Sequence, residues 1–168
     1  HIKTADAIFS SVGKVYHIDE DLFPAFGALG GASGAFVLMY IDALAEAGVR
    51  AGFARPITGE IATATVMGSG ALAMNSSEHP IALMNAVCSP GGTTIEGVCK
   101  LRELGFDTAV QQALQAIIAR TSFWRRTDAP ASTVVAVSRP VIADETIKNG
   151  RPLVAPTVLP VLPTMIAF

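Results

Sequence analysis

The sequence predicts an all-α fold, a helical bundle followed by an irregular or weakly β tail that is rich in proline. Helical periodicity recurs from residue 4 to residue 125 and is interrupted by Gly and Pro. A chain of 168 residues can bury one sizeable core. The composition changes at Thr127, after which the chain carries six of its ten prolines. We therefore expect two parts, a helical domain over residues 1–126 and a Pro-rich tail over residues 127–168.

Charge and cysteine usage exclude several classes of function. A net charge of −2 gives no electrostatic reason to expect binding to nucleic acid or to an anionic membrane. The two cysteines form neither a CxxC motif nor a disulfide framework, which fits a reducing, cytoplasmic compartment. The three histidines are far apart in the sequence, so we predict no metal site. The chain begins at His1 without a Met or a signal-peptide pattern, which indicates a fragment of a longer protein.

The first third of the chain mixes short elements. Residues 4–12 predict a short helix, and residues 14–18 an extended segment. The acidic run Asp19-Glu20-Asp21 favours the start of a helix that continues to Ala28. Residues 29–34 contain three glycines, so we expect a break there.

Two long helices are predicted next, over residues 35–50 and 56–75. In the first, Asp42, Glu46 and Arg50 form one narrow polar stripe, which indicates a helix buried on most sides. The second begins at a proline and is rich in Ala, Gly, Ser and Thr. Such small side chains let two helix backbones approach closely, which suits a helix in the centre of a dimer.

High apolar content also points to a subunit interface. The chain is 51% hydrophobic, and residues 22–41 carry no charge over a length that could span a bilayer. However, Pro24 and four glycines in this stretch would break a spanning helix and free backbone groups that lipid cannot satisfy. We therefore favour an extensive interface between subunits over a small helical membrane protein.

The remaining elements are shorter. Helices are predicted over residues 80–87, 94–104 and 107–125, the second ending at Gly105. The apolar face of the last one is formed by Val110, Leu114, Ile117 and Ile118. In the tail, residues 132–137 favour a strand and Asn149-Gly150 favours a two-residue hairpin, whereas the prolines exclude a terminal helix and a central strand.

The segment Ser89-Pro90-Gly91-Gly92-Thr93-Thr94-Ile95-Glu96 is the most informative in the chain. Its two glycines permit a tight turn and leave room for a ligand. Thr93 and Glu96 have the spacing of a capping box, which predicts a helix start. The first N–H groups of that helix could bind a carboxylate or phosphate. A well-capped helix after a turn, without a ligand, explains the spacing equally well.

Two neighbouring patterns are weaker. Cys88 borders this loop, but without an identifiable His partner we interpret it as a small buried apolar residue and not as a nucleophile. Residues 68–73 satisfy the G-x-G-x-x-A form of a dinucleotide fingerprint. Because that fingerprint requires a preceding strand, and residues 57–67 are predicted to be helical, we interpret these glycines as part of a helix interface.

With Cys88 before it and Lys100 to Phe106 after it, the loop resembles the C-terminal domain of pyrroline-5-carboxylate reductase. That family carries a Ser-Pro-Gly-Gly-(Thr/Ala)-Thr signature, a short helix, a Gly-Phe turn and a final helix. The resemblance runs from about residue 5 to about residue 125 and does not include the tail. It implies a helical dimerisation and substrate-binding domain, similar to the C-terminal domain of 6-phosphogluconate dehydrogenase, that forms an interlocked homodimer and often a higher oligomer.

The resemblance also implies an activity. Family members reduce 1-pyrroline-5-carboxylate to L-proline with NADPH or NADH, which an N-terminal Rossmann domain absent from this chain binds. The positions matching the family's substrate loop are Ser89, Gly91, Gly92, Thr93 and Thr94. Thr94 corresponds to the threonine that bonds the ring nitrogen, and we take it as the catalytic residue. Alone, the chain is expected to be inactive.

One motif departs from the family pattern. The family's Ser-Gly-Ser-Gly-Pro-Ala-Tyr appears here as Gly30-Gly31-Ala32-Ser33-Gly34-Ala35-Phe36, so both serines in register, the proline and the tyrosine are replaced. Substrate preference could therefore differ. The departure also leaves open a non-catalytic alternative, a helical oligomerisation module that kept the fold and lost turnover.

Overall fold

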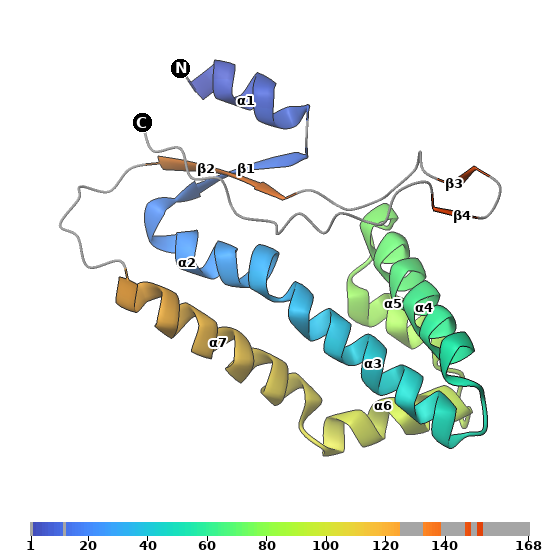
Figure 1. Ribbon diagram of the computed structural model, residues 1–168. Helices are drawn as coiled ribbons and strands as arrows, with labels where there is room; N and C mark the ends of the chain where they lie inside the picture. The colour runs from blue at the N-terminus through green and yellow to red at the C-terminus, as the bar shows by residue number, and fades with distance from the viewer. Residues whose placement is uncertain (1, 12, 125–132, 139–146, 149–150, 153–168) are drawn as a thin grey trace. The chain divides into compact units, whose positions relative to one another are not determined.

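The computed structural model describes residues 2–11, 13–124, 133–138, 147–148 and 151–152 (Figure 1). The chain divides into two compact units, one made of His1–Gly34 with Leu114–Phe168 and the other of Ala35–Ala113. Each unit is described here by itself. The elements in chain order are α1 (Ile2–Ser10), β1 (Lys14–Asp19), the 3₁₀ turn η1 (Glu20–Leu22), α2 (Phe23–Phe26), the π-helical turn η2 (Gly27–Ala32), α3 (Gly34–Arg50), α4 (Arg55–Asn75), α5 (Pro80–Val87), α6 (Thr93–Glu103), α7 (Phe106–Trp124), β2 (Thr133–Ser138), β3 (Ile147–Lys148) and β4 (Arg151–Pro152).

Helices dominate the described residues, and the predicted all-α class is confirmed. Apart from the helix expected over residues 19–28, which does not end at Ala28, the helices expected from the sequence form with ends within two residues of the predicted ones. The expected strands of the tail form as well. β2 pairs antiparallel with β1, and β3 pairs antiparallel with β4. The residues of the predicted hairpin turn, Asn149-Gly150, lie outside the described residues. The segment expected to be extended after β4 lies outside the described residues.

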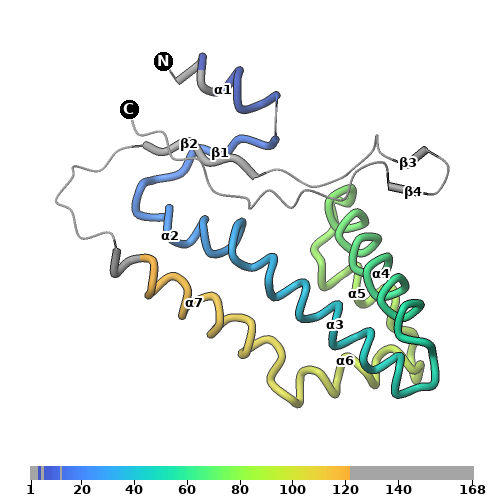
Figure 2. The backbone as a smooth tube through the Cα atoms, in the orientation of Figure 1, coloured from blue at the N-terminus to red at the C-terminus, as the bar shows by residue number. Residues whose placement is uncertain are grey.

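The predicted break over residues 29–34 is wrong. The helix that begins near Glu20 continues through η2 into α3, as the backbone trace in Figure 2 shows. Ser33 N–H donates to the carbonyl of Ala28 at 3.0 Å, an i→i−5 bond that defines the π-helical turn. Glycines lower helix propensity, but wider π-type bonding keeps the backbone amides of this stretch paired, so the helix does not end.

The contact between α3 and α4 depends on small side chains. Ala45 of α3 and Ala62 of α4 are among the few buried side chains of the chain, and Thr58 of α4 is only 4% exposed. A Cβ atom added at Gly48 would lie 2.6 Å from Cγ2 of Thr58. The two helix backbones therefore approach closely at this point because position 48 carries no side chain.

An exposed ion pair also joins these helices. Nη2 of Arg55 donates to Oε2 of Glu46 at 2.6 Å. This hydrogen bond is the main reason why the pKa of Arg55 is raised, and the charges of Glu46 and Asp42 add to it. Both side chains are more than half exposed, so solvent screens the ion pair. We therefore expect the packing of α3 on α4 to be stabilised mainly by the close contact at Gly48 and Thr58.

We expect Gly48→Ala to destabilise the chain. Alanine improves helix propensity by about 1 kcal/mol, but overpacking typically costs about 1–3 kcal/mol, so the net loss should be about 1 kcal/mol, within a range of about 0–2 kcal/mol. Thr58→Ser removes the opposing methyl group and keeps the hydroxyl, whose Oγ1 donates to the Arg55 carbonyl at 2.8 Å. The double variant should therefore lose less stability than the sum of the single variants.

The measurement is urea unfolding followed by circular dichroism at one fixed protein concentration. Gly97→Ala is the matched control, since a Cβ added at Gly97 in α6 meets nothing within 4 Å. It should stabilise the chain slightly. Equal effects of Gly48→Ala and Gly97→Ala would show that the close approach of α3 and α4 does not limit stability.

Large apolar side chains are mostly exposed in the single chain. The predicted burial of the 35–50 helix on most sides is wrong for one subunit, because Leu38 and Met39 of α3 are 68% and 71% exposed. The predicted apolar face of α7 is likewise only partly covered, since Val110 is 42% exposed. Further exposed apolar residues include Ile57, Ile61, Met67, Leu72 and Met74 of α4. The described residues of one chain do not provide a core for these side chains.

The stretch Glu20–Arg50 is long and apolar enough to cross a membrane by length and composition, and it is the single such helix among the described residues. Only 11% of its most apolar window is buried. The same properties are typical of a helix that a second subunit covers. Length and composition do not distinguish the two cases.

Candidate functional site

A tight turn built from Ser89, Pro90, Gly91 and Gly92 precedes α6. Gly92 N–H donates to the Ser89 carbonyl at 3.0 Å, which closes the turn. Pro90 occupies its second position, and Gly91 has a positive φ of 67° at its third. This is the residue pattern of a type II turn, in which glycine is favoured at the third position because L side chains rarely adopt a positive φ.

Gly92 is required for a second reason. A Cβ atom added there would collide with Oγ of Ser89 and would lie 3.1 Å from the Ser89 carbonyl oxygen. The Ser89 hydroxyl thus lies directly against the backbone at the start of α6. The turn therefore brings together two of the predicted site residues, a hydroxyl group and the backbone of the helix N-terminus.

The start of α6 has no side-chain cap. Gly92 is the N-cap residue, with φ −79° and ψ 168°, and no side chain bonds to the first turn as a cap. The predicted capping box is therefore wrong, because the helix begins at Thr93, one residue earlier than expected, and Thr93 is the first helical residue. The first backbone N–H groups of a helix have no acceptor within it, and they carry the positive end of the dipole.

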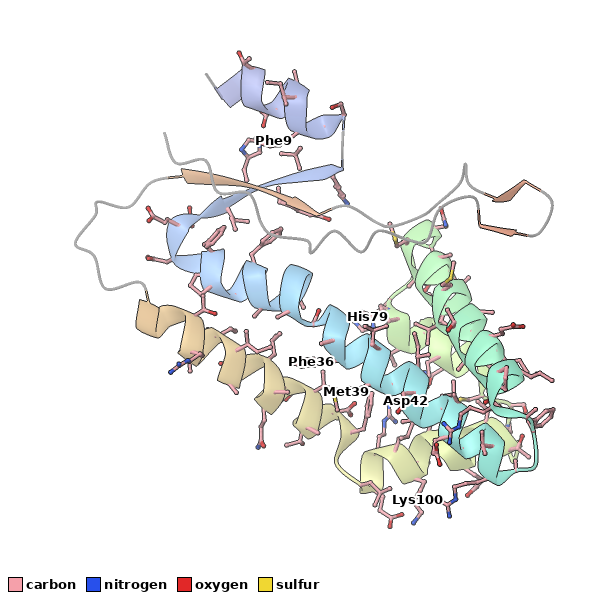
Figure 3. All side chains as sticks on the ribbon, in the orientation of Figure 1. Phe9, Phe36, Met39, Asp42, His79 and Lys100 are labelled. Atoms are coloured by element: carbon pink, nitrogen blue, oxygen red, sulfur yellow. The ribbon has the colours of Figure 1, made fainter. Side chains whose placement is uncertain are left out.

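The other end of α6 is stabilised as the sequence indicates. Gly105 follows the C-cap with φ 79°, and its N–H donates to the Arg102 carbonyl at 2.9 Å. Lys100 and Arg102 place positive charge in the last turn, which complements the helix dipole. Nζ of Lys100, labelled in Figure 3, bonds both carboxylate oxygens of Glu103 at 2.8 Å. The helix is thus well terminated, and its N-terminus remains open for a ligand.

The five predicted site residues form one continuous segment at this N-terminus. Gly92 is half-buried, whereas Ser89, Gly91, Thr93 and Thr94 are exposed. The threonines stand on the first two helical positions, so their backbone amides belong to the open first turn. Chemically, the segment offers hydroxyl groups and helix N–H donors to an anionic, hydrogen-bonding small molecule.

Neighbouring polar groups have structural explanations. Cys88 is the C-cap residue of α5 and is half-buried, not fully buried as predicted. Both Cys88 and Cys99 are free thiols. His79, which the sequence analysis did not single out, caps α5, since its Nδ1 accepts from Ile81 N–H at 3.2 Å. Within the described residues, no three His, Cys, Asp or Glu side chains gather to hold a metal ion.

The two glycine-rich patterns outside the loop are helical. Residues 68–73 lie inside α4, which confirms the prediction that they are not the turn of a dinucleotide fingerprint. Gly30 and Ala32 of the divergent motif lie in η2, whereas Phe36 lies in α3. Residues 89–94, the signature loop, belong to one compact unit, and the residues of η2 belong to the other.

Residues 20–123 match the family described as pyrroline-5-carboxylate reductase dimerisation. The chain is 42% identical over 117 residues to the pyrroline-5-carboxylate reductase of Synechocystis, an alignment that covers 70% of this chain and 44% of that protein. It is also 46% identical over 109 residues to the Aquifex aeolicus enzyme, covering 65% and 41% of the two chains. The chain thus spans less than half the length of these relatives.

The fold agrees with a solved structure. A Streptococcus pyogenes 1-pyrroline-5-carboxylate reductase superimposes with a TM-score of 0.60 at 41% identity, covering 61% of this chain and 40% of that one. The predicted resemblance is therefore confirmed by sequence and by structure. Both comparisons are confined to a similar fraction of the longer proteins. The chain belongs to the pyrroline-5-carboxylate reductase family, within its dimerisation domain.

Proposed function

We propose that this chain is the dimerisation and substrate-binding part of an enzyme that reduces 1-pyrroline-5-carboxylate to L-proline with NADPH or NADH. The observation that carries the proposal is the turn from Ser89 to Gly92, which we call the signature turn. It lies directly before a helix start that has no side-chain cap. The helical domain would comprise residues 1–126, with residues 127–168 as a separate tail. The subunits would form a cytoplasmic homodimer, with or without further assembly.

The turn suits the substrate's carboxylate. Open N–H groups at the start of α6, beginning at Thr93, would donate to its oxygens, and the Ser89 and Thr93 hydroxyls would add further bonds. Gly91 and Gly92 would let the ligand approach the backbone, since neither carries a side chain. Glu96 lies in the same first turn of α6. Its negative charge favours a carboxylate site at the very start of this turn, away from the Glu96 side chain.

Thr94 would act at the other end of the substrate. We assign its hydroxyl to the ring nitrogen of the imine, which becomes the amine of proline. When bound, the nicotinamide would supply a hydride to the carbon of the protonated imine, and the nitrogen would keep its proton as it becomes the neutral amine, which then takes a second proton from solvent. Holding the carboxylate and the nitrogen at once would fix the ring in one orientation, which is a large part of what a protein contributes to cofactor chemistry.

The cofactor would be held by a part of the enzyme outside this chain. The described residues contain no strand–turn–helix with the required glycines, since Gly68 and Gly70 lie within α4. A relative from Plasmodium falciparum, solved with NADP bound, superimposes with a TM-score of 0.65 at 28% identity over 71% of this chain and 45% of its own length. The unmatched part of such proteins has room for a cofactor domain.

The purified 168-residue chain is therefore expected to be inactive. No oxidation of NADPH should be seen at 340 nm when 1-pyrroline-5-carboxylate is added, whereas the longer protein containing this segment should oxidise it. Activity of the short chain would contradict the proposal that the cofactor is bound outside this chain. Inactivity of both proteins would instead contradict the proposed reaction.

A second candidate function is a helical oligomerisation module that has lost turnover. The replacement of the family motif by Gly30 to Phe36 is the specific observation in its favour. Under this hypothesis the longer protein assembles into dimers but does not bind L-proline. Titration calorimetry with L-proline distinguishes the hypotheses, since a reductase binds its product and a pure scaffold does not.

A further inference from the structure

The tail is joined to the N-terminal segment by a β-ladder. β2 pairs with β1 over six residue pairs, from Lys14 opposite Ser138 to Asp19 opposite Thr133. Figure 1 shows the two strands side by side, although they come from opposite ends of the chain. Both strands lie outside residues 20–123, the part that matches the family. The pairing is therefore a feature that the family match does not explain.

The chain itself contacts both faces of β1. On one face, Nε2 of His17 lies 3.2 Å from the buried Oδ1 of Asp6 in α1. On the other face, the Tyr16 ring contacts the Phe26 ring of α2, with a centroid distance of 6.0 Å. Since successive residues of a strand point to opposite faces, α1 and α2 lie on opposite sides of β1. The strand can therefore gain backbone partners only at its edges.

Each edge of a strand presents backbone N–H and C=O groups that need partners. A two-stranded ladder alone is marginally stable in water. Here the ladder is supported by the packing of α1 and α2 on its faces, and β2 provides the backbone partners for one whole edge of β1. Without β2, neither edge of β1 would be paired within the described chain.

The same strand contacts the start of the long helix. The Phe26 ring that Tyr16 contacts lies 3.9 Å from the position that a Cβ of Gly30 would occupy. Nζ of Lys14 adds a cation–π contact, 5.4 Å from the centroid of the Tyr16 ring. The position of β1 is therefore coupled, through two aromatic rings, to the π-helical turn η2.

We propose that β2 is an intramolecular strap, which occupies one edge of β1 and holds Tyr16 against Phe26 beside η2. The occupant of that edge is the chain's own C-terminal segment and not a second copy. The inference does not depend on the proposed reaction, because it concerns residues outside the signature loop. It gives β2 a structural role.

Paired cysteines test the strap in the 168-residue chain. Residues directly opposite each other in an antiparallel ladder share a face. We expect disulfides to form under mild oxidation in the double variants V15C/V137C and I18C/V134C, which sample both kinds of ladder pair. V15C/A136C is the matched control, because its cysteines point to opposite faces. Peptide mapping separates the new bonds from any made by Cys88 or Cys99.

Cross-links within one chain that exceed the control several-fold would support the strap. Cross-links only between two chains would show that β2 is exchanged between copies, and yields equal to the control would show that the ladder does not form. Either of these two results would overturn the proposal.

Hydrogen exchange provides a second, independent test. Val134→Pro and Val135→Pro each remove one backbone donor from the middle of β2, and because successive N–H groups of a strand point to opposite edges, one of these donors faces β1. We expect exchange of the amides of residues 14–19 to become at least about tenfold faster, while α4 and α6 stay unchanged. Val135→Thr, which keeps a β-branched side chain and the backbone N–H, should leave exchange as in the parent chain. Unchanged protection in both proline variants would overturn the proposal.

Discussion

Replacing Thr94 by alanine in the longer protein that we propose to be a reductase is expected to lower kcat/KM at least tenfold. Thr94 is the second residue of α6, exposed at an uncapped helix start. Under the proposed mechanism its hydroxyl contacts the ring nitrogen, whose bonding changes as hydride arrives. A tenfold loss corresponds to about 1.4 kcal/mol of transition-state stabilisation, the scale of one hydrogen bond to a reacting group. The measurement is NADPH oxidation with 1-pyrroline-5-carboxylate as substrate.

Two control variants separate the role of the hydroxyl from effects on folding. Thr94→Ser keeps the hydroxyl and should retain most of the activity. Thr63→Ala removes a threonine hydroxyl from α4, where Oγ1 donates to the Gly59 carbonyl at 2.8 Å, and should leave kcat/KM unchanged. If Thr94→Ala were as active as the parent enzyme, the assignment of Thr94 to the imine would be wrong. If Thr94→Ser lost as much as alanine, shape and not the hydroxyl would matter.

The helical elements could be predicted from local signals alone. Pro56 and Pro80 mark helix starts, and Gly105, with its positive φ, marks a helix end. Each of these signals involves only residues that are close together in the sequence. The continuation of the helix through Gly27–Ala32 could not be predicted in the same way. A π-helical turn forms when a backbone N–H donates to the carbonyl five residues earlier and not to the one four residues earlier. The glycine content of the segment indicates backbone flexibility but does not indicate which of these hydrogen bonds forms.

The signature turn was predictable in its residues but not in its capping. Thr93 and Glu96 have the spacing of a capping box, yet Gly92 takes the N-cap position. The turn closed by Ser89 and Gly92 sets where the helix starts, and this places Thr93 one position further in than the motif requires. A sequence motif of four residues cannot reveal that shift, because the preceding turn determines it.

Burial could not be inferred from one chain either. An amphipathic pattern predicts that an apolar face is covered, but it does not say by what. In α3, Leu38 and Met39 remain 68% and 71% exposed, and the buried apolar side chains among the described residues are small ones, Pro24, Ala28, Ala45 and Ala62. The chain matches the dimerisation domain of its family. We therefore expect a second subunit to supply the missing contacts, over an area of about 2,000 Å² or more, as obligate homodimers do.

Introducing one carboxylate into α4 should test this directly. Met67 is 64% exposed in the single chain, so Met67→Asp places a charge in solvent and should not disturb the monomer. If α4 is at the dimer interface, the carboxylate becomes buried without a partner on association. Such burial costs several kcal/mol, and we expect the dissociation constant of the dimer to rise at least about a hundredfold. Sedimentation velocity over a range of protein concentrations measures this change.

Arg102→Gln is the matched control, because it also lowers the net charge by one and because Arg102 is exposed in the last turn of α6. It should leave the dimer intact, as should Met67→Leu, which keeps an apolar side chain at the same place. Circular dichroism should show that Met67→Asp retains its helices, so that dissociation reflects the interface and not unfolding. A dimer that tolerates Met67→Asp as well as Arg102→Gln would remove α4 from the interface and leave the exposed face of α3, with Leu38 and Met39, as the surface to be covered.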